Sequence, residues 1–173
     1  MVKKKINLID ISELIQNVYH ICACINNDNI LTNNLIFMNY VNQYQNDKYD
    51  QLYLKLNISE KKQFNKINNV ETILGSETSI QLPIRSVDKI LMVDVYHEFN
   101  FPIEMIASIK NALKPEGQLF LIEYRGEDPK VPIKKIHKMT ENQAVKEMEA
   151  AGFKLKSNIT NLPWQHCMIF VLE

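Results

Sequence analysis

The chain has 173 residues, of which 46% are hydrophobic and 23% are charged, and its formal net charge is zero. This length fits a single domain over residues 1–173 with a substantial core. The balanced charge argues against a basic face for nucleic acid and against an acidic tail. Acidic residues follow the basic start, which argues against a signal peptide, and no apolar run has the length of a membrane span.

The first half of the chain alternates between helical and extended patterns, separated by asparagine-rich turns. Apolar residues at helical spacing predict helices, and short apolar or alternating runs predict strands. We expect helices over residues 7–18, 31–45 and 59–68, and strands over residues 18–25, 51–58 and 70–74.

The second half gives stronger signals, because its strands are continuous apolar runs of the kind that is buried on both faces. We expect strands over residues 86–96, 118–124, 153–160 and 166–173, and helices over residues 102–114 and 140–152. A tight turn is expected at "PEG", residues 115–117.

Both expected helices of the second half carry terminal signals. Pro102 stands in the first turn of one, and Thr140 and Gly152 bracket the other as cap and stop. The apolar face of the first should point inward; its members are Ile103, Ile106, Ile109 and Leu113. The alternation predicts an α/β fold with a mainly parallel sheet, helices on both faces and a C-terminal antiparallel strand at or near one edge.

The three cysteines, Cys22, Cys24 and Cys167, do not form a disulfide framework, which makes the cytoplasm the default compartment. Cys22 and Cys24 would share one face of a strand, with His20 as the nearest further ligand. Two thiols and one imidazole fall short of a complete site, so we interpret these cysteines as buried small hydrophobes and expect no metal site.

Three segments in this order, "SVDKILMVDVYHEF", "IKNALKPEGQLFLIEYR" and "MTENQAVKEMEAAGFK", resemble the class I S-adenosylmethionine-dependent methyltransferases. "LKPEG" is similar to the connector "LKPGG" of that family, and "AAGF" before the closing strands is typical of it. The strong match covers about residues 68 to 170, and "VYHEF" with "EYRGEDPKVPIKKIHKMT" resembles a branch of small bacterial enzymes. The resemblance implies a Rossmann-like three-layer sandwich with S-adenosyl-L-methionine across the carboxyl ends of the strands.

The resemblance also assigns roles to residues. Glu77 would contact the adenine, and the end of the fourth strand would face methyl donor and acceptor. His97 is then a candidate base, Asp94 or Glu98 would orient it or bind the amino group of the cofactor, and Arg125 would hold an acidic acceptor. The catalytic candidates are Asp94, His97, Glu98 and Arg125, and the cofactor candidates are Cys24, Asn26, Asn57, Glu77, Asp94 and Val95.

Structural roles compete with these assignments. Asp94 would then cap a loop, and His97 with Glu98 would be a local hydrogen-bonded pair. Arg125 with Glu127 would be a solvated surface pair. His137 in "KKIHK" is expected in an exposed basic turn, and Trp164 is expected to pack on the last hairpin or to wall an acceptor pocket.

The cofactor half departs from the family pattern. The first strand of the family ends in a glycine-rich turn, because the backbone must approach the cofactor closely and adopt positive φ. By order and spacing, "ICACINNDNIL" holds that place, and no glycine precedes Gly75. Asn57 stands where an acid normally binds both ribose hydroxyls, unless Glu60 takes over.

These features favour a methyltransferase-family protein with weakened or lost cofactor binding. The alternatives are an active small-molecule methyltransferase with an altered cofactor loop, and a non-catalytic binding or regulatory module on the same fold. The expected partner is a small-molecule acceptor or a protein, and neither nucleic acid nor a membrane.

Overall fold

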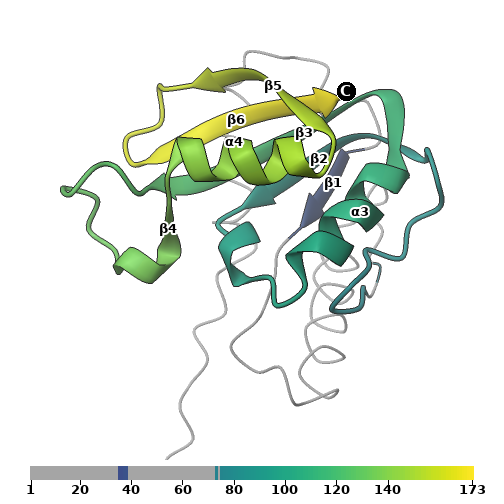
Figure 1. Ribbon diagram of the computed structural model, residues 1–173, viewed down its shortest axis with the longest axis horizontal. Helices are drawn as coiled ribbons and strands as arrows, with labels where there is room; N and C mark the ends of the chain where they lie inside the picture. Colours follow the sequence, from purple (N-terminus) through teal and green to yellow (C-terminus); the bar gives the residue numbers. More distant parts are fainter. Residues whose placement is uncertain (1–34, 39–72, 74) are drawn as a thin grey trace, which may run out of the picture.

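The computed structural model describes residues 35–38, 73 and 75–173. The elements of this part are shown in Figure 1. They are β1 (Leu35–Met38), β2 (Val87–Val93), the 3-10 helix η2 (Tyr96–Glu98), α3 (Pro102–Ala112), β3 (Leu113–Arg125), the 3-10 helix η3 (Lys135–His137), β4 (Lys138–Met139), α4 (Glu141–Ala150), β5 (Phe153–Ile159) and β6 (Gln165–Leu172).

The strands form one mixed sheet with the order β1-β2-β3-β6-β5, and β4 pairs with the end of β3. β1, β2 and β3 are parallel, whereas β6 runs antiparallel to both of its neighbours, β3 and β5. The α/β class and the closing antiparallel strand are therefore confirmed, with β6 inserted beside the edge strand β5 (Figure 1).

The expected helix over residues 31–45 is wrong at Leu35–Met38, which form β1 and pair with β2 from Leu35↔Lys89 to Met38↔Met92. A short apolar run such as "LIFM" does not separate a helix from a buried strand by periodicity, and here the parallel ladder decides. In doubly wound sheets the first strand stands beside the fourth, so β1 occupies the place that we expected for residues 18–25.

β3 carries an irregularity at the predicted turn. Its pairing with β2 goes from Val87↔Leu113 to Lys89↔Gln118, an advance of two residues on β2 and five on β3. The additional residues include "PEG", which leaves the ladder without ending the strand. A Cβ on Gly117 would lie 2.8 Å from the backbone oxygen of Lys114, so a side chain does not fit at this close approach.

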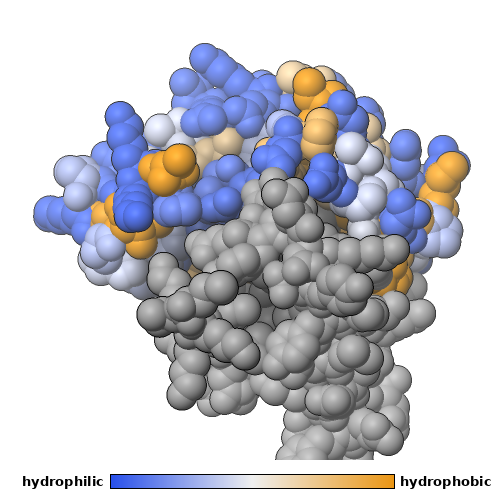
Figure 2. Space-filling model, turned by 90° about the horizontal axis from the view of Figure 1, so that it is seen from below, coloured by the Kyte–Doolittle hydropathy of each residue, from blue (hydrophilic) through white to orange (hydrophobic). Residues whose placement is uncertain are grey.

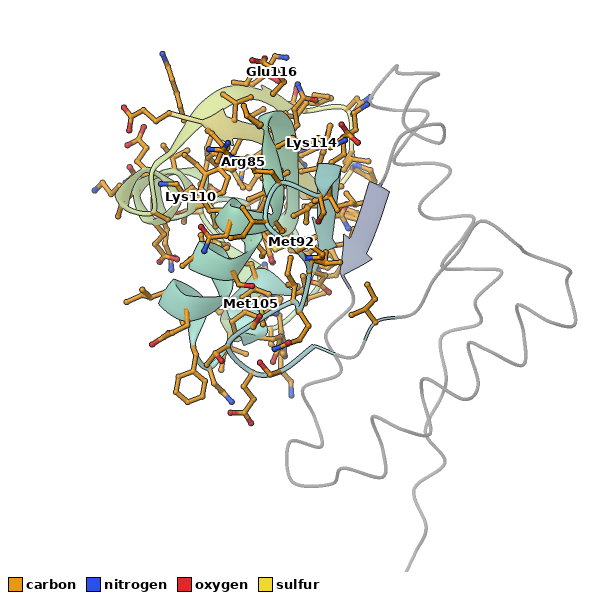
Figure 3. The ribbon with its side chains drawn as sticks, turned by 90° about the vertical axis from the view of Figure 1, so that its right-hand side faces the viewer. Arg85, Met92, Met105, Lys110, Lys114 and Glu116 are labelled. Atoms are coloured by element: carbon orange, nitrogen blue, oxygen red, sulfur yellow. The ribbon has the colours of Figure 1, made fainter. Side chains whose placement is uncertain are left out.

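α3 begins with Pro102, as predicted, and buries one face against the sheet. The buried residues of this helix are Met105, Ile106, Ile109 and Ala112. The expected inward position of Ile103 is wrong, because its side chain is 81% exposed. Met105 takes part in the core instead, in the same cluster as Met92 of β2 (Figure 3).

α4 has the predicted ends. The Thr140 hydroxyl accepts a hydrogen bond from the Gln143 N–H at 3.1 Å, and Gly152 follows the helix with φ of +82°. Both described α-helices pack into one core cluster on the same face of the sheet, so this part of the chain does not show the expected helices on both faces. The opposite face buries a second cluster of Leu91, Phe120, Ile122, Leu162, Cys167 and Ile169.

Seen from below, the described surface is mainly hydrophilic, with small separate apolar patches (Figure 2). Among the described residues, no helix is both long and apolar enough to cross a membrane.

Candidate functional site

The polar residues after β2 lie beside the end of β3. Asp94 comes directly after β2 with φ of +52°, and its N–H donates to the Ile122 carbonyl at 2.8 Å. A positive φ is uncommon for any residue other than glycine, and such residues gather at functional sites. The chain then turns into η2, which carries Tyr96, His97 and Glu98.

Glu123, near the end of β3, organises this turn. Its side chain is fully buried, and Oε1 accepts hydrogen bonds from the backbone N–H groups of Val95 at 3.3 Å and Tyr96 at 2.8 Å. Oε2 lies 2.7 Å from Nδ1 of His97, so the carboxylate also orients the imidazole. The sequence patterns gave Glu123 no role, although an acid within the apolar run "LFLIEY" is itself a signal.

His137 joins the group from η3. Its Nδ1 lies 3.2 Å from Nε2 of His97 and 2.9 Å from Oε1 of Glu98. Residues 134–136 of this basic turn are exposed as expected, but the His137 side chain is only 37% exposed and contacts the site. The Nε2 atom of His97 is also 3.2 Å from Oε1 of Glu98, so the expected local pair of His97 and Glu98 is present as well.

The charges of this group shift two pKa values. Burial raises the pKa of Asp94 to about 6, helped by the negative charge of Glu123 and opposed by His97 and His137. Burial acts to lower the pKa of His97, but the hydrogen bond and charge of Glu123, with the charges of Asp94 and Glu98, outweigh it and leave that pKa raised. The surrounding carboxylates therefore make the His97 imidazole more basic.

A pocket of about 230 Å³ adjoins His97, between the turn after β2 and α4. Its lining residues include Tyr96, His97, Met139, Gln143 and Glu147. The Tyr96 hydroxyl donates to Oε2 of Glu147 at 2.8 Å, which links the turn to the helix. The wall thus combines an imidazole and hydrogen-bonding groups with apolar side chains.

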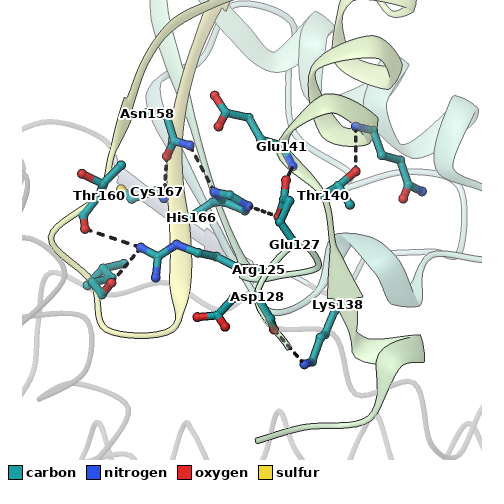
Figure 4. A network of polar contacts seen from close by, with 12 residues as sticks. Arg125, Glu127, Asp128, Lys138, Thr140, Glu141, Asn158, Thr160, His166 and Cys167 are labelled. Carbon is teal, nitrogen blue, oxygen red and sulfur yellow. Dashed lines mark hydrogen bonds and ion pairs between the residues drawn. The ribbon is translucent and has the colours of Figure 1, made fainter. Parts of the chain in front are cut away.

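Arg125 holds a loop of the closing hairpin (Figure 4). Its guanidinium donates to the backbone oxygens of Leu162 at 2.8 Å, Pro163 at 3.0 Å and Thr160 at 3.5 Å. We also considered a surface ion pair between Arg125 and Glu127, but among the described residues these two side chains form no such pair. Glu127 instead accepts hydrogen bonds from His166 Nε2 at 3.0 Å and from the Glu141 N–H.

The remaining candidates divide into described and undescribed residues. Val95 is buried, and its N–H reaches Glu123. Glu77 is exposed in the turn Ser76–Ser79. A hydrogen bond between the hydroxyls of Ser79 and Ser108 links this turn to α3. Trp164, directly before β6, is 40% exposed, so most of its surface is covered. Cys24, Asn26 and Asn57 lie outside the described residues.

Comparison with known proteins agrees with this architecture. A family model described as a methyltransferase domain matches residues 41–121. No curated protein sequence matches the chain.

Solved structures of similar fold include three methyltransferases. An S-adenosylmethionine-dependent methyltransferase from Aquifex aeolicus has a TM-score of 0.64 and 22% identity, covering 69% of this chain and 64% of its own. A candidate type 11 methyltransferase from Sulfolobus solfataricus has a TM-score of 0.56 and 17% identity, covering 81% and 85%. The trans-methyltransferase CalH, in complex with SAH, has a TM-score of 0.54 and 16% identity, covering 71% and 40%.

The chain thus spans 64% of the length of the Aquifex protein, less than two thirds of it. The strand order with an inserted antiparallel strand, the methyltransferase-domain match and these neighbours lead to one conclusion. The chain has the fold of the class I S-adenosylmethionine-dependent methyltransferases.

Proposed function

We propose that the chain is an S-adenosylmethionine-dependent methyltransferase-family protein with an assembled acceptor side and weakened cofactor binding. The main structural support for a methyltransferase site is the contact of 2.7 Å between His97 Nδ1 and the buried carboxylate of Glu123. It stands at the carboxyl ends of β2 and β3, where open α/β sheets bind their ligands.

The chemistry follows from the tautomer of His97. A carboxylate only accepts hydrogen bonds, so Nδ1 of His97 carries a proton toward Glu123, and Nε2 of the neutral ring holds the lone pair. That nitrogen is suited to take a proton from an acceptor, and His97 also borders the pocket. The cofactor, when bound, supplies the methyl group, and the protein aligns the two reactants.

The cofactor side fits S-adenosylmethionine only in part. Asp94 offers a carboxylate that is 44% exposed at the end of β2, suited to the amino group of the cofactor. The chain has no glycine before Gly75, so the backbone cannot approach a cofactor at the end of β1 as glycine permits. Asn57 would bind ribose without the strength of a charged acceptor. This combination supports weakened binding.

Two alternatives have support of their own. The pocket beside Tyr96 and Glu147 favours an active small-molecule methyltransferase with an altered cofactor loop. The missing glycines favour a non-catalytic binding or regulatory module with a small molecule or protein as partner. The absence of a disulfide framework supports a cytoplasmic location for either.

Calorimetric titration of the full chain with S-adenosylmethionine and S-adenosylhomocysteine tests the proposal. We expect dissociation constants in the millimolar range. Micromolar binding would overturn the weakened cofactor site and support the active enzyme. The absence of heat and of any thermal shift at millimolar ligand would overturn the methyltransferase assignment and leave the non-catalytic module.

A further inference from the structure

Three ligand atoms from η2 and η3 converge on one point. Nε2 of His97 lies 3.2 Å from Nδ1 of His137 and 3.2 Å from Oε1 of Glu98. The third side of this triangle, from Nδ1 of His137 to Oε1 of Glu98, is 2.9 Å. All three distances are short enough for a direct interaction between polar atoms.

Hydrogen bonds cannot satisfy all three contacts while the Glu98 side chain is a carboxylate. A carboxylate oxygen only accepts, and each ring nitrogen either donates or accepts, so at least two of the three mutually adjacent atoms are of the same kind. If His137 donates, Nε2 of His97 and the carboxylate face each other as acceptors. If both imidazoles donate to Glu98, two N–H groups face each other. With Glu98 as a carboxylate, one contact of the triangle is therefore repulsive for every distribution of protons on the two imidazoles.

A cation placed between the three atoms makes all three contacts favourable. Bonds of about 2.0–2.1 Å to a zinc-like ion place adjacent ligand atoms about 3.3 Å apart in a tetrahedral site and about 2.9 Å apart in an octahedral one. The observed separations of 2.9, 3.2 and 3.2 Å fall within this interval. We propose that His97, Glu98 and His137 bind one divalent transition-metal ion.

The surroundings of His97 support this assignment. A histidine that binds a metal through one nitrogen usually donates its other N–H to a carboxylate, which fixes the ring. Glu123 does this for His97 at 2.7 Å, and two backbone N–H groups hold Glu123 in turn. The ring planes of His97 and His137 are inclined by 71° in an edge arrangement, so the two rings do not stack face to face.

Ligand chemistry and access narrow the class of ion. Two imidazoles and one carboxylate suit Zn²⁺, Fe²⁺ or Co²⁺, whereas Mg²⁺ and Ca²⁺ prefer oxygen alone. The side chains of His137 and Glu98 are 37% and 29% exposed, so an ion can enter from solvent. Three protein ligands leave at least one open coordination position, as in catalytic zinc sites.

A second group of close potential ligands consists of Asp94, His97 and Glu123, and we do not propose a metal site there. Asp94 lies 3.9 Å from Nδ1 of His97, while Glu123 is already paired with that nitrogen and with two backbone N–H groups. Hydrogen bonds therefore account for this group without an ion.

The metal site stands independently of the proposed methyl transfer, because its ligands are defined without a cofactor. If both hold, His97, Glu98 and His137 would hold the ion, Nε2 of His97 would not be available as a base, and the ion would supply Lewis-acid activation in its place. Loss of metal binding would leave the base role of His97 intact, and loss of cofactor binding would leave the metal site intact.

Calorimetric titration of Zn²⁺ into the metal-free full chain tests the site. We expect one ion per chain, no competition by Mg²⁺, and a rise in melting temperature with Zn²⁺ because the ion binds the folded state. His137→Gln should lower the affinity by at least about 10- to 100-fold, the loss that follows even from changes to the partners of metal ligands. Glu98→Gln should act in the same direction.

Two control variants make the result specific. Lys135→Gln changes an exposed residue of the same 3-10 helix and should bind Zn²⁺ like the wild type. The Cys22→Ser/Cys24→Ser variant should also keep its affinity, which excludes a thiolate site. No binding by the wild type at millimolar Zn²⁺ would overturn the proposal. Binding that survives His137→Gln and Glu98→Gln, or that is lost with the two cysteines, would overturn it equally.

Discussion

Oε2 of Glu123 lies 2.7 Å from Nδ1 of His97, and the carboxyl group has no exposed surface. The other oxygen accepts the N–H groups of Val95 and Tyr96, so one carboxylate fixes both the backbone of the turn and the imidazole. A buried carboxylate is costly unless it is hydrogen-bonded, and Glu123 is bonded at both oxygens. The position of His97 is thus determined by a residue of the neighbouring strand.

Replacement of Glu123 by glutamine should destabilise the fold. The amide removes the charge that strengthens these hydrogen bonds, and its NH₂ group would face an N–H of either the backbone or His97. We expect the free energy of unfolding to fall by about 2 kcal/mol, in the range of hydrogen bonds to charged groups. Urea denaturation measures it. Glu116→Gln, an exposed change in the same strand, is the control, and an equal effect of both would contradict this role.

The helix α4 is followed by a residue whose backbone adopts the left-handed conformation. Gly152 has φ of +82°, and a Cβ there would also meet the ammonium group of Lys110. We expect Gly152→Ala to cost about 1–2 kcal/mol of unfolding free energy from the backbone conformation. Gly152→Asn displaces Lys110 as well but tolerates positive φ, so thermal unfolding should show a smaller loss. Equal losses would mean that the contact with Lys110 dominates.

The Glu127 carboxylate should contribute stability that depends on pH. Partial burial acts to raise its pKa, but hydrogen bonds from its own backbone, His166 and the Glu141 N–H lower that pKa below 4.5. A carboxylate with a depressed pKa stabilises the fold above its unfolded pKa and loses this effect as pH falls through the folded pKa. The stability difference between wild type and Glu127→Gln should therefore shrink on acidification below about pH 4.5.

Denaturation curves across this pH range measure the difference, with the exposed Glu149→Gln as the matched control. A difference for Glu127→Gln that stays constant or grows toward acid pH would contradict the role of its hydrogen bonds.

Arg125 should act on the hairpin loop. Lysine keeps the charge but cannot donate to Leu162 and Pro163 in the planar geometry of guanidinium. We expect Arg125→Lys to accelerate amide hydrogen exchange in residues 160–165 and to cost about 1 kcal/mol of unfolding free energy. Unchanged exchange together with a loss of ligand binding would instead support the acceptor-binding role that the family resemblance implied.

Sequence patterns predicted the fold where the local signals agreed. The apolar runs of β2 and β3, the cap at Thr140 and the stop at Gly152 each gave one consistent answer. β1 was missed because four apolar residues do not define a period, and its identity depends on pairing with β2. Ile103 was misplaced for a similar reason, since the sheet, and not the helix, selects the buried face.

Sequence patterns grouped the candidate site residues only where they are adjacent in sequence. Asp94, His97 and Glu98 form one cluster in the chain, and the structure brings His97 and Glu98 into contact. His137 is 40 residues from His97, and only the packing of η3 against η2 brings the two imidazoles together. Arg125 had the right chemistry for an acidic acceptor, but the hairpin carbonyls within its reach engage it.

The central claim is that the end of β2 still meets S-adenosylmethionine, but weakly. Amide NMR of the ¹⁵N-labelled chain during titration with S-adenosylhomocysteine measures location and affinity together, because weak ligands exchange fast. We predict graded shifts of the Asp94, Val95 and Tyr96 amides that approach saturation only at millimolar ligand. Saturation at micromolar ligand, or shifts that leave these three amides unmoved, would contradict the account.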